Sequence, residues 1–126
     1  MKFFIDNNLS PKLAEGMQGF GEKVMHLQEL FDPATSDVEW LEYIGKNNLI
    51  LVTRDKRIRW HPAELTVFKM YKVGAFFLGG KERSRCQLIE QLVRNWSKMK
   101  ELSDTTERPF AYRIPPKGKE YKKLLE

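Results

Sequence analysis

The stretch LILVTRDKRIRW, residues 49–60, runs from four aliphatic residues into Thr53 without any alternation of apolar and polar positions. Such a run is typical of a strand that is buried on both faces, as the central strands of a parallel sheet are. Beyond the strand, one carboxylate, Asp55, lies among four basic residues: Arg54, Lys56, Arg57 and Arg59. This acid is either a neutralised surface charge or one corner of a metal site whose substrate is a polyanion.

The rest of the chain alternates between strand-like and helix-like segments. Strands are predicted at residues 2–6, 23–27, 49–53, 73–78 and 110–114, and helices at 11–18, 37–46, 62–71 and 84–102. Ser10-Pro11 is a helix start, and Ser36-x-x-Glu39 fits a capping box. This alternation predicts an α/β fold, a three-layer sandwich with a mostly parallel central sheet. We expect one domain over residues 1–115 and a charged tail or short helix over residues 116–126.

Composition bounds the functional classes. The 126 residues are 41% hydrophobic and carry a net charge of +5, which indicates a globular domain with an anionic partner, nucleic acid first. The longest apolar runs are far too short to cross a bilayer, and the N-terminal sequence lacks a signal peptide's apolar segment, so we expect a cytoplasmic protein with no membrane partner. The single cysteine excludes an intramolecular disulfide and a thiolate zinc cluster.

Three acids stand where strands end or helices begin. Asp6 ends the first predicted strand, Asp55 follows the third, and Asp37 lies in the first turn of the helix that leads into the third. Ligands of open parallel sheets bind outside the carboxyl ends of the strands, so Asp6, Asp37 and Asp55 are predicted to converge there as metal ligands and catalytic residues. Oxygen-only ligation suits Mg²⁺ or Mn²⁺, which activate water and neutralise phosphate charge.

Other residues near these acids have predicted supporting roles. Arg54, Lys56, Arg57 and Arg59 are expected to hold the phosphates of RNA. Asn7 and Thr53 are placed to orient the acids, and Glu39 is either a further ligand or only a capping residue.

Each acid also has a purely structural interpretation. Asp6 fits an Asx turn after a strand. Asp37 fits the positive end of a helix macrodipole, which is worth about 0.3–1 kcal/mol. Asp55 fits a surface salt bridge worth about 0–1 kcal/mol. The occurrence of all three acids at equivalent ends of adjacent elements favours a shared site.

The segments FFIDNNLSPKLAEGMQGFG and SDVEWLEYIGKNNLILVTRDKRI resemble PIN-like domain proteins. Within that family they are similar to the compact group with a D-x-N-L-P start and a T-x-D strand end, which includes VapC-type toxins of toxin–antitoxin pairs. The resemblance covers about residues 1–80. It implies a PIN-like fold, divalent-metal-dependent endoribonuclease activity and a protein antitoxin as partner. Asp6, Asp37 and Asp55 match the family's metal-binding acids by position.

Arg57 departs from the family pattern. Relatives often carry a further acid at this position, two residues after the T-x-D aspartate, whereas this chain has a base. Arg57 therefore either contacts the scissile phosphate or marks a catalytically inactive PIN-like module that binds RNA or a partner protein. A receiver-like signalling domain is a second alternative, since its acids also cluster at strand ends, but four bases around Asp55 argue against it.

The long helix is predicted to carry one apolar stripe, formed by Leu88, Ile89, Leu92, Val93, Trp96 and Met99. The apolar end of this helix, Trp96, Met99 and Leu102, has two interpretations. It packs in the core, or it forms a surface for the antitoxin or for a second copy of the chain in a homodimer.

Overall fold

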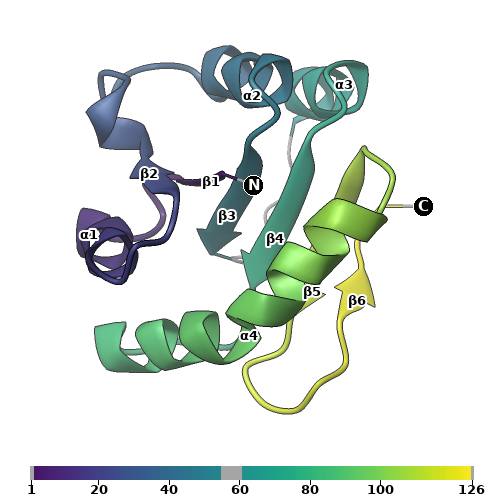
Figure 1. Cartoon of the computed structure of the whole chain (residues 1–126). Helices are drawn as coiled ribbons and strands as arrows, with labels where there is room; N and C mark the ends of the chain where they lie inside the picture. Colours follow the sequence, from purple (N-terminus) through teal and green to yellow (C-terminus); the bar gives the residue numbers. More distant parts are fainter. Residues whose placement is uncertain (1, 55–60, 126) are drawn as a thin grey trace.

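The computed structural model describes residues 2–54 and 61–125. Within these residues the chain forms a single mixed α/β unit (Figure 1). Its elements follow in this order: β1 (Phe3–Ile5), α1 (Pro11–Gly19), β2 (Val24–His26), the 3₁₀ helix η1 (Leu27–Glu29), α2 (Asp37–Lys46), β3 (Ile50–Arg54), α3 (Pro62–Met70), β4 (Gly74–Leu78), α4 (Arg85–Thr105), β5 (Phe110–Ile114) and β6 (Lys122–Lys123).

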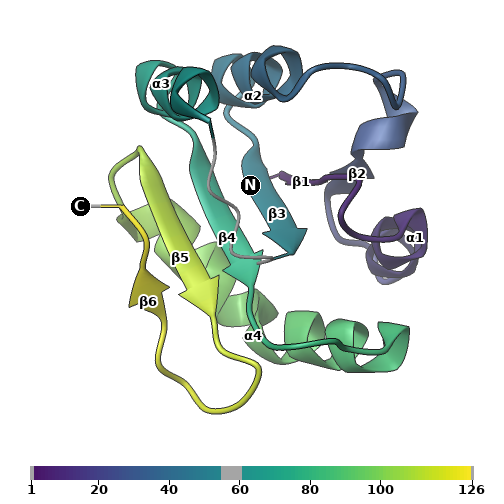
Figure 2. The same ribbon diagram turned by 180° about the vertical axis from the view of Figure 1, so that it is seen from behind.

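The strands form one sheet in the order β2-β1-β3-β4-β5-β6. The pairs from β2 to β5 are all parallel, and only the short β6 is antiparallel to its neighbour β5. All five residues of β3 are buried at the centre of the sheet, which confirms the prediction made from the unbroken apolar run. The carboxyl ends of the five parallel strands share one edge, called the carboxyl edge below. The arrowheads of β3, β4 and β5 point to it in Figures 1 and 2.

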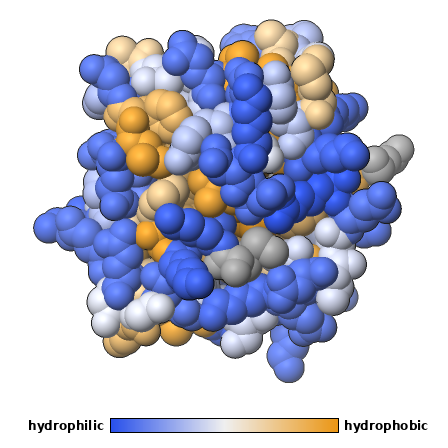
Figure 3. All heavy atoms as spheres, turned by 45° about the horizontal axis from the view of Figure 1, so that its top comes forward, coloured by the Kyte–Doolittle hydropathy of each residue, from blue (hydrophilic) through white to orange (hydrophobic). Residues whose placement is uncertain are grey.

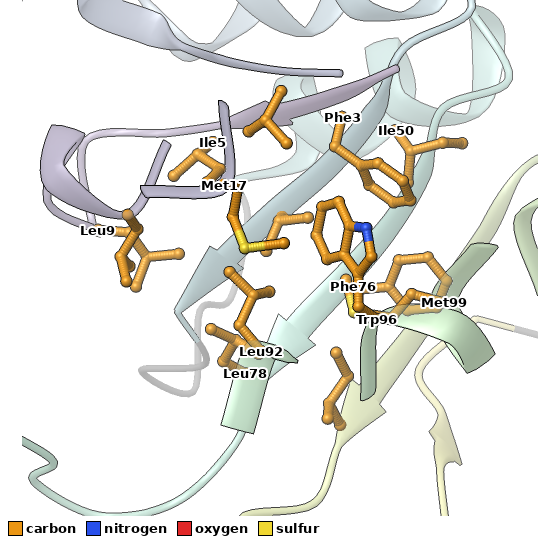
Figure 4. Packing of buried hydrophobic residues seen from close by; sticks show 14 of the residues in the cluster. Phe3, Ile5, Leu9, Met17, Ile50, Phe76, Leu78, Leu92, Trp96 and Met99 are labelled. Atoms are coloured by element: carbon orange, nitrogen blue, oxygen red, sulfur yellow. The ribbon is translucent and has the colours of Figure 1, made fainter. Parts of the chain in front are cut away.

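Helices cover both faces of the sheet and give the expected three layers. α4 crosses the face toward the viewer in Figure 1 and lies behind the sheet in Figure 2. With α1 it encloses one apolar core, in which the ring centroids of Trp96 and Phe3 lie 4.5 Å apart (Figure 4). α2 and α3 enclose a second core on the opposite face, around Phe4, Leu41 and Phe68.

Local capping explains why the helices start where the sequence predicts. The Ser10 hydroxyl accepts a hydrogen bond from the Lys12 amide, and Pro11 occupies the first helical position of α1. The Ser36 hydroxyl accepts from the Glu39 amide at the start of α2. Ser84 and Gln87 form a complete, reciprocal capping box at the start of α4.

Two expectations about the C-terminal third need correction. Ile89 and Val93 belong to the predicted apolar stripe of the long helix, yet they are 42% and 52% exposed, because only the Leu92, Trp96 and Met99 side of α4 faces the sheet. The expectation of a tail or short helix over 116–126 is wrong for Lys122–Lys123, which form β6 and pair with β5. The domain boundary at residue 115 stays a prediction.

Trp96 and Met99 are buried in the core, as the core interpretation of the α4 end predicts. The face shown in Figure 3 is largely hydrophilic, with hydrophobic residues in separate patches. Among the described residues, each helix is too short or too polar to cross a bilayer.

Candidate active site

Asp6 lies at the carboxyl edge, immediately after β1, and is only 5% exposed. Both of its oxygens accept hydrogen bonds. Oδ2 accepts from the Thr53 hydroxyl at 2.6 Å, and Oδ1 accepts from the backbone amide of Asn8 at 3.0 Å. The Asn8 contact is the Asx turn that the structural interpretation predicts. The Thr53 contact reaches across to β3, since the parallel register of β1 and β3 pairs Ile5 with Val52.

The surroundings of Asp6 raise its pKa from the usual 3.8 to about 6. Burial is the largest cause, because it disfavours the charged form of the carboxyl group. The hydrogen bonds from Thr53 and Asn8 act in the opposite direction, and the negative charge of Asp37 raises the pKa further. The charge interaction with His26 lowers the pKa and is the smallest of these causes. A cation bound beside Asp6 would add opposite charge and stabilise the carboxylate further.

Asp37 and Asp6 line the same cavity of about 260 Å³. Asp37 is exposed in the first turn of α2, and its Oδ1 accepts a hydrogen bond from the buried Trp40 indole at 3.0 Å. The cavity is completed by residues from the loop after β1, from η1, from the approach to α2 and from α2 itself: Asn7, Asn8, Leu27, Pro33, Thr35 and Trp40. The fold therefore brings together two of the three predicted acids.

The predicted supporting residues are placed differently from one another. Thr53 orients Asp6 directly, as expected. Asn7 is exposed, and its side-chain oxygen accepts a hydrogen bond from Gln28 Nε2 at 3.1 Å. This hydrogen bond is to Gln28 and not to an acid. Glu39 is exposed at the third position of α2 and does not line the cavity. Its amide donates to the Ser36 hydroxyl, a cap that Ser36 supplies, and the role of the Glu39 side chain stays a prediction.

Asn8 is a residue that reasoning from the sequence missed. Besides its amide bond to Asp6, its Nδ2 lies 3.4 Å from Thr53 Oγ1 and 3.5 Å from Asp6 Oδ2. The sequence signal is the D-x-N spacing, because an Asx turn brings the side chain at the second following position back toward the aspartate.

Of the four predicted phosphate-binding bases, the structure describes Arg54. Its side chain is 8% exposed, and its Nη2 donates to the backbone carbonyls of Gly80 (3.1 Å) and Lys81. These contacts hold the loop after β4 against the end of β3, so Arg54 has a structural task at the carboxyl edge. Asp55, Lys56, Arg57 and Arg59 lie outside the described residues, and their predicted roles stay predictions.

The donors present fit a hard divalent cation. Asp6 and Asp37 offer carboxylate oxygens to one cavity, and oxygen ligands are those that Mg²⁺ and Mn²⁺ prefer. Within residues 2–54 and 61–125 there is no group of three acids, histidines or cysteines that could hold a metal. The described residues therefore include two of the three predicted ligands, Asp6 and Asp37.

The fold and the site place this protein among α/β domains with paired acids at the carboxyl edge of a mostly parallel sheet. Ligands of such sheets bind at that edge. Residues 1–80 match the family model described as a PIN like domain, and the chain belongs to this family. PIN-like domains are commonly nucleases, and PIN domains typically use divalent metal ions. Neither the curated proteins nor the solved structures contain a match to the chain.

Proposed function

We propose that this protein is a Mg²⁺- or Mn²⁺-dependent endoribonuclease that hydrolyses RNA phosphodiester bonds. The observation that supports it best is the pairing of Asp6 and Asp37 in one cavity at the carboxyl edge. Burying one acid beside another is costly in the free protein, and a bound cation offsets that cost. The family membership supports nuclease chemistry in general.

In this proposal Asp6, Asp37 and Asp55 hold the ion. When bound, the ion activates water and offsets negative charge on the phosphodiester. The protein's own contribution is preorganisation: Thr53 and Asn8 each donate to one oxygen of Asp6 and set the direction of its carboxylate. The Trp40 indole does the same for Asp37 from the second core. Lys56, Arg57 and Arg59 provide positive charge for the RNA backbone.

The test is cleavage of a 5′-labelled single-stranded RNA in Mn²⁺, in Mg²⁺ and in EDTA. Asp37→Asn keeps an oxygen acceptor for the Trp40 indole while it removes the charge. We expect a loss of at least about 100-fold, the upper end of what removal of an outer-shell partner costs at a metal site. Asp32→Asn is the matched control, because Asp32 is exposed and caps the amide of Ala34 outside the cavity. Full cleavage by the Asp37 variant, or cleavage in EDTA, would refute the proposal.

We also propose a cellular role from the resemblance to VapC-type toxins. The chain is the toxin of a toxin–antitoxin pair, and a small antitoxin protein is its partner. Induced expression should then arrest growth, and co-expression of a small protein encoded beside it should relieve the arrest. Asp37→Asn should abolish the arrest as well. Growth arrest that persists in this variant would separate toxicity from the proposed nuclease site.

An inactive PIN-like module that binds RNA is the alternative, and Arg57 is the feature that favours it. Such a module binds RNA in a salt-sensitive manner but shows no Mn²⁺-dependent cleavage. The Arg57→Asp variant tests it directly, because that change restores the acid that relatives often carry. Cleavage that appears only in Arg57→Asp would establish the alternative for the natural chain.

A further inference from the structure

A second cavity, of about 400 Å³, lies between α4 and the loop that joins β5 to β6. It is called the cationic cavity here and is lined by Arg94, Asn95, Lys98, Gly118, Lys119 and Tyr121. It shares no lining residue with the Asp6 cavity, and it lies outside residues 1–80, which match the family. Three of its six residues are basic and none is acidic.

The cations of this cavity are held in place by backbone oxygens. Arg94 Nη2 donates to the Pro116 carbonyl at 3.0 Å, and Lys98 Nζ donates to the Lys119 carbonyl at 3.1 Å. Lys98 Nζ also lies 4.4 Å from the centre of the Tyr121 ring. These contacts use part of the donor capacity, since a guanidinium has five N–H groups and an ammonium three.

A partly buried chain of two hydrogen bonds supports the wall of the cavity. The Tyr121 hydroxyl donates to Asn95 Oδ1 at 2.7 Å, and Asn95 Nδ2 donates to the Gln91 carbonyl at 2.7 Å. Asn95 is only 5% exposed. Burial raises the pKa of Tyr121 to about 12, so its hydroxyl stays a donor at neutral pH. The cavity is therefore built on ordered side chains.

The positive charges of the cationic cavity have no carboxylate partner in the part of the chain that the structure describes. Among the described residues, no carboxylate lies within ion-pair distance of Arg94, Lys98 or Lys119. The excess of basic over acidic residues lies in the C-terminal part of the sequence, which also supplies the cavity's lining residues. Residues 1–80 carry 10 basic and 10 acidic side chains, whereas residues 81–126 carry 12 basic and 7 acidic ones. Like charges gathered in one hollow repel each other, and an anionic ligand relieves that repulsion.

The cationic cavity also adjoins the carboxyl edge. The loop that contains Gly118 and Lys119 follows the carboxyl end of β5, and β5 is parallel to β4 and β3 (Figure 2). The loop after the neighbouring β4 contributes Lys81 and Arg83, and Arg85 begins α4 directly after it. Basic residues thus follow the ends of adjacent strands between the Asp6 side of the sheet and the cationic cavity.

We propose that the cationic cavity is a second binding site for single-stranded RNA, which it holds through the phosphate backbone. The three basic side chains and their arrangement indicate that the ligand carries phosphate groups. The choice of RNA among phosphate-bearing ligands rests on the proposed ribonuclease function. Arg94 and Lys98 supply donors that are already oriented, and Lys119 adds an exposed charge at the mouth. This site adds affinity for RNA that extends beyond the cleaved bond.

The experiment measures binding of a fluorescein-labelled 20-nucleotide single-stranded RNA by anisotropy, in EDTA, from about 50 to 200 mM salt. The test variant is Lys98→Gln with Lys119→Gln. The matched control is Lys69→Gln with Lys72→Gln, because these lysines are also exposed and the change in net charge is the same. Loss of two phosphate contacts should reduce the slope of log K against log salt by about 1.4 for the test variant. The control slope should stay at the wild-type value.

Lys119→Glu gives a second, independent variant, since this exposed side chain has no recorded partner in the described part of the chain and its replacement leaves the fold intact. It should weaken RNA binding more than Lys69→Glu does. Equal slopes for the two double variants, or equal affinities for the two single ones, would overturn the cavity proposal. Because binding is measured without metal, the two proposals fail separately. RNA binding with the expected slopes but no cleavage in Mn²⁺ overturns only the ribonuclease function, and cleavage with equal slopes overturns only the cavity.

Discussion

The Asp6→Asn substitution should stabilise the metal-free fold while it removes the proposed activity. Asp6 is buried, and its pKa is raised from 3.8 to about 6. A folded-state pKa above the unfolded value means that stability is full below pH 3.8 and is lost as the pH rises through 6. The shift of about 2 pH units corresponds to about 3 kcal/mol at neutral pH, at about 1.4 kcal/mol per unit.

Asparagine keeps the two shorter hydrogen bonds of the site and loses only the 3.5 Å contact from Asn8 Nδ2, which an amide nitrogen cannot accept. Its oxygen accepts from the Asn8 amide, and its amide donates to the Thr53 hydroxyl oxygen, which turns from donor to acceptor. The neutral side chain does not carry the cost of a buried charge. Asp6→Asn should therefore raise the free energy of unfolding by up to about 3 kcal/mol at pH 7.5 and by almost nothing at pH 4.

The assay is urea unfolding in EDTA from pH 4 to pH 7.5, followed by tryptophan fluorescence. Asp32→Asn is the control, because Asp32 makes the same kind of Asx contact, to the Ala34 amide at 2.8 Å, on an exposed loop. Its effect should stay within about 0.5 kcal/mol at each pH. A stability difference for Asp6→Asn that does not grow between pH 4 and pH 7.5 would refute the reasoning about the buried charge.

Three further substitutions test other features of the structure. Asp37→Asn should lower the pKa of Asp6, because the charge of Asp37 contributes to raising it. A ¹³C NMR titration of the Asp6 carboxyl group measures this, and an unchanged pKa would contradict their electrostatic coupling. Gly45→Ala should destabilise the fold by about 1–3 kcal/mol in urea unfolding, since the added Cβ would lie 2.5 Å from the Tyr71 carbonyl oxygen. Gly16→Ala, which has open space in α1, should instead stabilise it by about 0.5–1 kcal/mol, and similar effects of both changes would refute the packing argument.

Local signals in the sequence predict most of the secondary structure. Ser10-Pro11 and Ser84 place helix starts, since capping depends on residues within one turn. The aliphatic run that becomes β3 predicts burial on both faces, since polar positions are absent from it. Such local signals do not predict β6. Its two lysines carry no apolar pattern, and they pair with β5 because the chain returns along the open edge of that strand.

The α4 stripe shows a different limit. Helical spacing places Ile89 and Val93 beside Leu92, but the line along which α4 crosses the sheet decides which of them is buried. Arg54 is a further example, because a base next to other bases reads as a surface charge. The structure instead turns it inward to the carbonyls of Gly80 and Lys81, which are far away in the sequence.

By itself, the sequence determined the α/β class, the parallel central strand and the position of Asp6 and Asp37 at element ends. These properties depend on periodicity, capping and chain order, which are local. Only the tertiary structure decided that both acids line one cavity, that Thr53 and Asn8 hold Asp6, and that Arg94, Lys98 and Lys119 meet. The physical reason is that strand pairing and helix docking set distances between residues that are remote along the chain.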